Sequence, residues 1–135
     1  MKAKTLISWL LRIAASAILL QTLYFKFTGN PESVELFTKL GVEPWGRYFT
    51  GSIELIVGIL LLIPSTAFAG SFLGIGLMAG AILSHLTVIG IESRGDGGQL
   101  FMLAITVLIS CLIIAVLHRK EGALLFNKLI KKNKY

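Results

Sequence analysis

Four long apolar segments separated by short polar stretches dominate the pattern of this sequence. A helix needs about 20 mostly apolar residues to cross a bilayer. The second segment is short, but it begins with aromatic residues, which are favoured at the membrane surface. The pattern therefore predicts an all-α membrane protein, a bundle of four transmembrane helices at about residues 6–27, 48–63, 66–91 and 100–117.

Two shorter amphipathic helices are predicted outside the spans. After the first span, Asn30 can cap a helix, Pro31 suits its first turn, and Gly41 provides a stop. After the fourth span, the tail 118–135 combines apolar residues with lysines, which is typical of a helix at the membrane surface. We therefore expect one domain, residues 1–135, with a short amphipathic outer-loop helix and a basic C-terminal interfacial helix.

The composition favours the membrane over water as the solvent. Of the 135 residues, 55% are hydrophobic and 15% charged, and the mean hydropathy is +0.80. A soluble domain of this size cannot bury so much apolar surface. The first segment could also pass for a secretory signal, but Arg12 splits its apolar core and the apolar run continues through Leu23. We expect it to be retained as a span.

Basic residues gather at the two ends of the chain, which carries a formal net charge of +6. The positive-inside rule therefore places both termini in the cytoplasm, as an even number of spans requires. No basic surface interleaved with aromatic residues indicates binding to nucleic acid. The residues that set this orientation are Lys2, Lys4, Arg12, Arg119, Lys120, Lys128, Lys131, Lys132 and Lys134.

The third span contains glycines at the spacing that lets helices approach closely. They are Gly70, Gly74, Gly76 and Gly80. Small residues four apart are typical of helix contacts in membranes. The contact can lie within one chain, which we favour, or between subunits of a homo-oligomer.

Glu54 lies inside the apolar run 53–63, where a carboxylate is costly and marks a candidate functional site. At 1.5 Å per residue, it lies roughly 9 Å below the outer boundary of its span. His85 reaches a similar depth on a helix that runs the other way. Gln21 and Lys26 lie near the outer end of the first span, and Gln99 opens the fourth.

All four spans thus place a polar group in one outer-leaflet layer. Glu54 and His85 are the candidate catalytic pair, as a proton relay or a quinone contact, and the candidate ligand-binding residues are Gln21, Lys26 and Gln99. Histidine moves protons near neutral pH, and proton-linked redox chemistry at a quinone ring needs such a pair. The alternative is a structural polar network that joins the helices.

Other chemistries have weaker support in the sequence. Glu92 or Asp96 could add a third metal ligand, but no HxxH, ExxH or HExxH spacing occurs, so no metal site is predicted. His118 lies at the opposite membrane face from the candidate layer, which excludes a haem held by two histidines of one chain. The single cysteine, Cys111, excludes an internal disulfide. Nucleophilic triads and phosphate-binding loops are absent.

Several motifs follow one another in a recognisable order along the chain. They are Phe25-Lys-Phe-Thr-Gly29, Pro31-Glu-Ser-Val-Glu-Leu-Phe-Thr-Lys-Leu-Gly41, Tyr48-Phe-Thr-Gly-Ser-Ile-Glu54, Gly58-Ile-Leu-Leu-Leu-Ile-Pro64 and Ala81-Ile-Leu-Ser-His85. From about Leu11 through Leu117, their order and spacing resemble the DoxX family of small four-span bacterial membrane proteins. The resemblance implies a bacterial inner membrane, an association with quinol-linked oxidoreductases, and functional positions at Lys26, Glu54 and His85. Related four-span proteins handle disulfides, but this chain lacks their cysteine pairs.

Three functional hypotheses follow. The first is a subunit or partner protein of a membrane oxidoreductase, with quinone as the possible cofactor and Glu54 and His85 as its contacts. The second is a non-catalytic module that binds or transports a lipid or a small apolar molecule. The third is a structural scaffold for partner enzymes. Whether the chain is itself an enzyme stays open.

Overall fold

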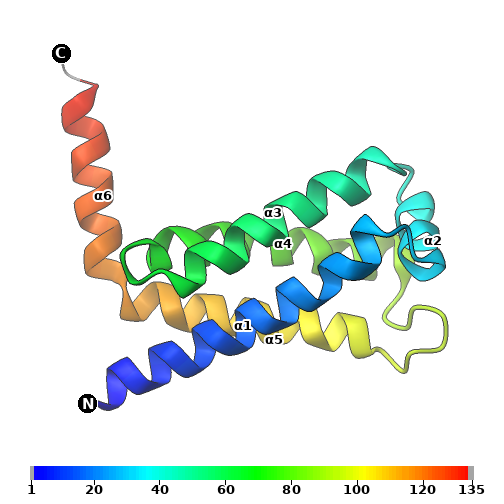
Figure 1. Cartoon of the computed structure of the whole chain (residues 1–135), viewed down its shortest axis with the longest axis horizontal. Helices are drawn as coiled ribbons and strands as arrows, with labels where there is room; N and C mark the ends of the chain where they lie inside the picture. Colours follow the sequence, from blue (N-terminus) through cyan, green and yellow to red (C-terminus); the bar gives the residue numbers. More distant parts are fainter. Residues whose placement is uncertain (1, 134–135) are drawn as a thin grey trace.

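The computed structural model describes residues 2–133 and is helical throughout its ordered elements, with no strand in that range. Figure 1 shows four long helices packed into a bundle. They are α1 (Ala3–Phe27), α3 (Trp45–Leu62), α4 (Ala67–Ser84) and α5 (Gln99–Leu117). With the turn and the π-helical segment that extend α4, all four are long and apolar enough to cross a membrane. The predicted all-α four-span bundle is confirmed.

The bounds of the spans are close to the predicted ones, and the other elements are short or lie outside the bundle. The third predicted span, 66–91, corresponds to one continuous helical segment, Pro64–Ile89, whose α-helical part ends at Ser84 and continues as a π-helical turn. The other three spans begin or end within a few residues of their predicted bounds. The additional elements are α2 (Pro31–Lys39), the turn η1 (Pro64–Thr66), the π-helical turn η2 (His85–Ile89) and α6 (Arg119–Lys132).

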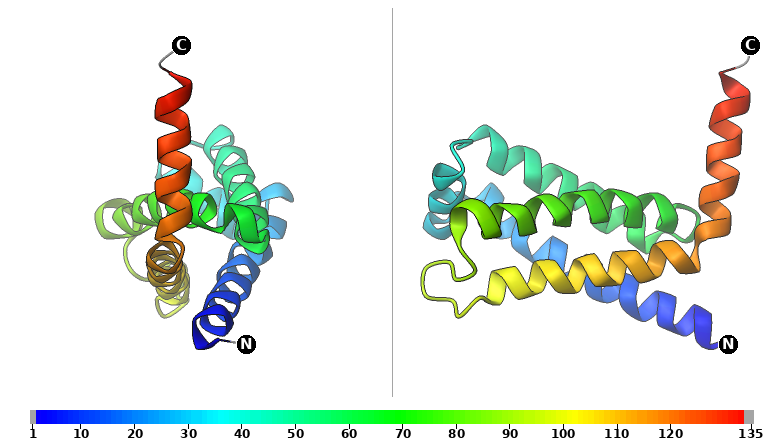
Figure 2. Two further views of the ribbon diagram at one scale, coloured as in Figure 1. Left: turned by 90° about the vertical axis from the view of Figure 1, so that its left-hand side faces the viewer. Right: turned by 180° about the vertical axis from the view of Figure 1, so that it is seen from behind.

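The four long helices form a ring in which α1 and α4 each pack against both α3 and α5. Figures 1 and 2 show that α2 and the loop 90–98 lie together at one end of the bundle, here called the α2 end. The N-terminus of α1 and the start of α6 lie at the other, the α6 end. Helix α6 runs across the bundle axis, as expected of an interfacial helix.

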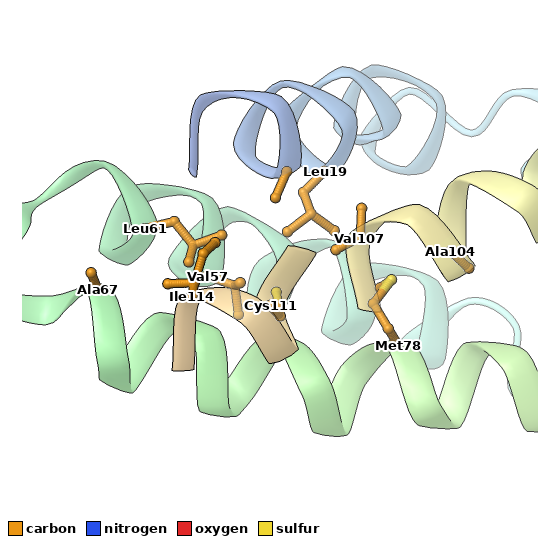
Figure 3. Close-up of a cluster of buried hydrophobic side chains, with 10 residues drawn as sticks. Leu19, Val57, Leu61, Ala67, Met78, Ala104, Val107, Cys111 and Ile114 are labelled. Atoms are coloured by element: carbon orange, nitrogen blue, oxygen red, sulfur yellow. The ribbon is translucent and has the colours of Figure 1, made fainter. Parts of the chain in front are cut away.

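A core of small and branched side chains fills the middle of the ring (Figure 3). A Cβ added at Gly74 would lie 2.7 Å from the Cys111 sulfur, and one at Gly70 would lie 2.9 Å from the Leu60 Cβ. These two glycines therefore serve close packing within the chain, as favoured from the sequence. Gly76 and Gly80 do not, since nothing lies within 4 Å of a Cβ there. The core residues are Ala15, Leu19, Val57, Leu61, Ala67, Met78, Ala104, Val107, Cys111 and Ile114.

The outer surface of the bundle carries large apolar side chains. Leu10, Phe72, Leu83 and Val116 are each at least 60% exposed. A soluble protein rarely exposes a contiguous apolar surface of this kind, whereas lipid tails solvate it without cost. The chain is therefore an integral membrane protein.

Both predicted amphipathic helices are present. The Asn30 side-chain oxygen accepts a hydrogen bond from the Glu32 backbone N–H at 3.0 Å, and Pro31 occupies the first turn of α2. The second helix, α6, carries exposed Leu124 and Phe126 together with its lysines. The last two residues of the predicted tail, 134 and 135, lie outside the described residues.

The C-terminal end of α3 is completed by side chains from elsewhere. Pro64 has no N–H, so the Leu60 carbonyl, which would pair with it in a continuing helix, needs another donor. The Thr66 hydroxyl donates to it at 2.8 Å. The next carbonyl, that of Leu61, accepts from the Arg12 Nε of α1.

Candidate functional site

A cavity of about 750 Å³ opens at the α2 end of the bundle. Its walls come from α1, α3, α4 and α5, and α2 and the loop 90–98 contribute where the helices end. The cavity is lined by all five candidate residues, Gln21, Lys26, Glu54, His85 and Gln99. The structure thus places these side chains at one site, while their chemical roles stay predictions.

Glu54 and Lys26 form a buried ion pair. The Lys26 Nζ lies 3.0 Å from the Glu54 Oε2, and the two side chains are only 13% and 7% exposed. The Thr22 hydroxyl lies 3.1 Å from the same oxygen and 2.8 Å from the Leu19 carbonyl, so its one proton is shared between two acceptors. Thr22 was missed from the sequence, although it lies one helical turn before Lys26 on the same face of α1.

Arg47 supports the backbone beneath this ion pair. Its guanidinium is paired with the Glu43 carboxylate at 2.8 Å, lies over the Tyr48 ring at 4.4 Å, and donates to the Lys26 backbone carbonyl. The residue is only 4% exposed. Arg47 therefore fastens the start of α3 to the end of α1, next to Lys26. Sequence analysis assigned it no role, although Glu43 and Arg47 are spaced one helical turn apart, as in helical ion pairs.

His85 is held by the turn that follows it. Its Nδ1 lies 2.8 Å from the Gly90 carbonyl oxygen, and the Gly90 N–H donates to the His85 carbonyl at 2.8 Å. Gly90 has a φ of +88°, a conformation that L side chains rarely adopt. The Phe101 ring meets the imidazole edge-on at a centroid distance of 5.6 Å. These contacts fix both the position and the plane of the ring.

The same contact determines the protonation of the imidazole nitrogens. A carbonyl oxygen only accepts hydrogen bonds, so Nδ1 must carry the proton and donate it to Gly90. In the neutral ring, Nε2 is then an acceptor with a free lone pair. His85 therefore has a hydrogen-bond acceptor at Nε2.

Asp96 organises the loop 90–98 and the start of α5. Its carboxylate accepts hydrogen bonds from the backbone N–H groups of Ser93, Gly98 and Leu100 at 3.0, 2.8 and 3.1 Å. Burial of the carboxyl opposes its ionisation, but these three donors outweigh that effect and keep the pKa of Asp96 below its ordinary value. Asp96 is thus committed to the backbone.

The loop and α2 meet where the cavity reaches the end of the bundle. The Arg94 Nε lies 3.2 Å from one Glu35 carboxylate oxygen, and the Lys39 Nζ lies 3.3 Å from the other. All three side chains are more than 40% exposed. Such surface pairs contribute little to stability, so this side of the cavity is held by weak contacts.

Within residues 2–133, no three His, Cys, Asp or Glu side chains gather closely enough to bind a metal ion. Of the two loop acids considered as a third ligand, Asp96 has its oxygens on backbone donors and Glu92 is exposed to solvent. His118 lies at the α6 end, where it pairs with Glu121.

Apolar side chains make up most of the remaining cavity wall, among them Leu19, Phe37, Leu77, Leu103 and Val107. A few polar groups converging in a mainly apolar cavity of several hundred Å³ are typical of small-molecule sites. The five candidate residues contribute one ion pair, one imidazole and two amides. Hydroxyl and charged side chains complete the polar lining, namely Thr22, Glu32, Ser33, Thr50, Ser84, Ser93, Arg94 and Asp96. This set can hold a flat apolar ring that carries oxygen atoms at its edge.

Comparison of the sequence with known proteins gave one result. The sequence profile of the DoxX-like family matches residues 10–113. Comparison with the curated proteins gave no match, and neither did comparison with the solved structures. The matched range covers α3 and α4 completely, most of α1 and α5, and all five candidate residues. The chain therefore belongs to the DoxX-like family.

Proposed function

We propose that the protein binds a quinol in the cavity at the α2 end and serves as the membrane subunit of an oxidoreductase. The observation that carries this proposal is the His85 imidazole, whose Nδ1–H is committed to Gly90 while its Nε2 stays available as an acceptor. One quinol hydroxyl donates to Nε2. The second hydroxyl donates to the Glu54 carboxylate, and the Lys26 ammonium, which also lines the cavity, reaches the oxygen of that hydroxyl.

Oxidation of a quinol releases two electrons and two protons. His85 accepts the first proton at Nε2. Glu54 accepts the second as it parts from Lys26, whose ammonium then stabilises the quinone oxygen. The electrons pass to a redox centre of the partner oxidoreductase, because one buried cysteine cannot form a dithiol within the chain. In the reverse reaction the same residues return the protons.

This proposal is tested by measuring how tightly the purified protein binds decylubiquinol, a short-chain quinol analogue. Loss of one hydrogen bond involving a charged or well-oriented partner corresponds to about a tenfold weaker affinity. We expect this loss for His85→Gln and for Glu54→Gln, measured by equilibrium titration. Glu92→Gln is the control, since it removes a carboxylate that does not line the cavity.

A variant that fills the cavity without changing a charge provides a second test. Gly80 lines the cavity and has no atom within 4 Å of a Cβ position, so Gly80→Phe places a ring in the open space. We expect it to abolish binding while the protein keeps its fold by circular dichroism. Unchanged affinity in Gly80→Phe and in His85→Gln would contradict the proposal.

Because Glu54 and Lys26 are already paired with each other, a second candidate function is the non-catalytic binding of a lipid or another apolar molecule. Glu54 has both Lys26 and Thr22 as partners and is already neutralised. In that case a lipid or an alkyl detergent displaces the quinol analogue. His85→Gln and Glu54→Gln then have no effect, and only Gly80→Phe prevents binding.

A further inference from the structure

A second cavity, of about 310 Å³, lies at the α6 end of the bundle. Its wall includes Lys4, Ser8 and Arg12 of α1, together with His118 and Glu121 at the junction of α5 and α6. It shares no lining residue with the first cavity. Its chemistry also differs, because two cations and a histidine line it and one carboxylate opposes them.

Arg12, which lines this cavity, has an unused hydrogen-bond donor. The residue is 2% exposed, and its Nη2 is the one buried side-chain polar atom without a hydrogen-bond partner in residues 2–133. Its Nε donates to the Leu61 carbonyl, and the guanidinium lies 3.9 Å from the centre of the Trp9 ring. A buried charged group that keeps an unpaired N–H is costly unless a ligand completes it.

The nearest carboxylate is occupied by another partner. The Glu121 oxygen lies 2.9 Å from the His118 Nδ1, and the His118 Nε2 lies 2.7 Å from the Ser8 hydroxyl. The carboxylate accepts the Nδ1–H, so Nε2 of the neutral ring accepts from Ser8. This chain of contacts holds Glu121 to His118 and leaves Arg12 and Lys4 as the cations available to an anion.

We propose that Arg12, with Lys4, binds a phosphate group in this second cavity, and that the phosphate belongs to a membrane phospholipid. A guanidinium offers paired N–H donors that match phosphate oxygens, which a single ammonium does not. The residues that line the cavity belong to the first part of α1 and to the junction of α5 and α6. Figure 2 shows these two segments at the same end of the bundle, where the basic, partly apolar helix α6 leaves it. A lipid headgroup meets a membrane protein at that level.

The site is tested on the full chain, delipidated in a neutral detergent. The probes are phosphatidylglycerol, phosphatidylcholine, a glycolipid without phosphate, and inorganic phosphate. Lipid retention is measured by native mass spectrometry, and the stabilisation by each probe is measured as the shift in unfolding temperature. We expect both phospholipids to bind and stabilise, and the glycolipid to do neither.

Four variants assign the effect to this cavity. Arg12→Gln should weaken phospholipid binding about tenfold or more, and Arg12→Lys should weaken it less. Glu121→Gln should strengthen binding, because it removes the opposing charge. Arg119→Gln is the matched control, since it removes a nearby cation that does not line the cavity. Equal losses in Arg12→Gln and Arg119→Gln would overturn the site.

Two further outcomes are decisive. If inorganic phosphate stabilises the protein as well as the phospholipids do, and Arg12→Gln removes that effect, the phosphate site stands and its assignment to lipid is wrong. If Arg12→Gln does not fold, the test rests on two surface variants with opposite expected effects. Lys4→Gln should then weaken binding and Glu121→Gln should strengthen it, and an unchanged affinity in both overturns the proposal.

Discussion

Lys26 and Glu54 form a buried ion pair in which each charge depends mainly on the other for compensation. Both side chains are buried, and within residues 2–133 the one further hydrogen bond to the carboxylate comes from Thr22. Removing one partner of such a pair leaves an uncompensated charge, which costs more than the pair itself contributes. The pair therefore restricts which single substitutions the cavity tolerates.

We predict that Lys26→Met lowers the free energy of unfolding by about 3–5 kcal/mol, because the Glu54 carboxylate is left unpaired. Adding Glu54→Gln to Lys26→Met should restore most of this loss. Unfolding in mixed detergent micelles measures both variants and completes a double-mutant cycle. If the losses in unfolding free energy of the two single variants simply add in the double variant, the two charges do not stabilise each other.

At the scale of the element, the π-helical turn η2 is the feature that distinguishes α4 from a uniform span. π-helical turns are rare and are often found at functional sites. Here the turn brings the Gly90 carbonyl to the His85 ring and ends the helix at a positive φ. The backbone thus determines which imidazole nitrogen carries the proton.

Gly90→Ala should weaken binding of the quinol analogue without changing any group that lines the cavity. The substitution strains a residue with φ +88° and displaces the carbonyl that orients His85. Gly97→Ala is the control, since Gly97 has a similar φ of +67° in the same loop and makes no contact with His85. Equal affinities in the two variants would show that the orientation of His85 does not matter for binding.

The loop 90–98 should lose stability in acid because of Asp96. Its pKa is lowered in the folded state, so its contribution is fully present above the ordinary pKa of about 3.9 and is lost as the pH falls through the folded value. Asp96→Asn should therefore lower the unfolding temperature at pH 7 and reduce its decrease between pH 5 and pH 3. If Asp96→Asn keeps the full acid-induced decrease in unfolding temperature, that decrease comes from other carboxyl groups.

The elements were predictable where local rules decide them. Apolar length indicated the spans, and Asn30, Pro31 and Gly41 indicated α2. The depth of polar residues along each span also indicated five of the residues that line the first cavity. The π-helical turn at His85 was not predictable, because it depends on a hydrogen bond to the Gly90 backbone rather than on hydrophobic spacing.

Contacts between distant residues were beyond the reach of sequence patterns. Arg12 binds a carbonyl 49 residues away, and Ser8 meets His118 across 110 residues. Nucleophilic and phosphate-binding motifs are defined by short spacings along the chain. They therefore do not bring together residues that are distant in the sequence. Arg47 was missed for the same reason, since its contact with the Lys26 backbone comes from packing of α3 against α1.

At the scale of the whole molecule, the two ends of the bundle should lie on opposite sides of the membrane, with α6 on the cytoplasmic side. Glu92→Cys should react with an impermeant maleimide in intact cells, whereas Lys120→Cys should react only after permeabilisation. Cys111 is buried in the core and should leave the wild-type protein unlabelled. Labelling of Lys120→Cys in intact cells would show the orientation opposite to the one that the positive-inside rule predicts.

The contact between Arg12 and α3 has a consequence for synthesis of the chain. Helix α1 is translated before α3 and carries a guanidinium within its apolar run, where a charge without a partner is costly. Its backbone acceptor, the Leu61 carbonyl, is translated 49 residues later. The α1–α3 hairpin is therefore the smallest translated unit in which Arg12 has this acceptor, so we expect the first two spans to enter the bilayer together.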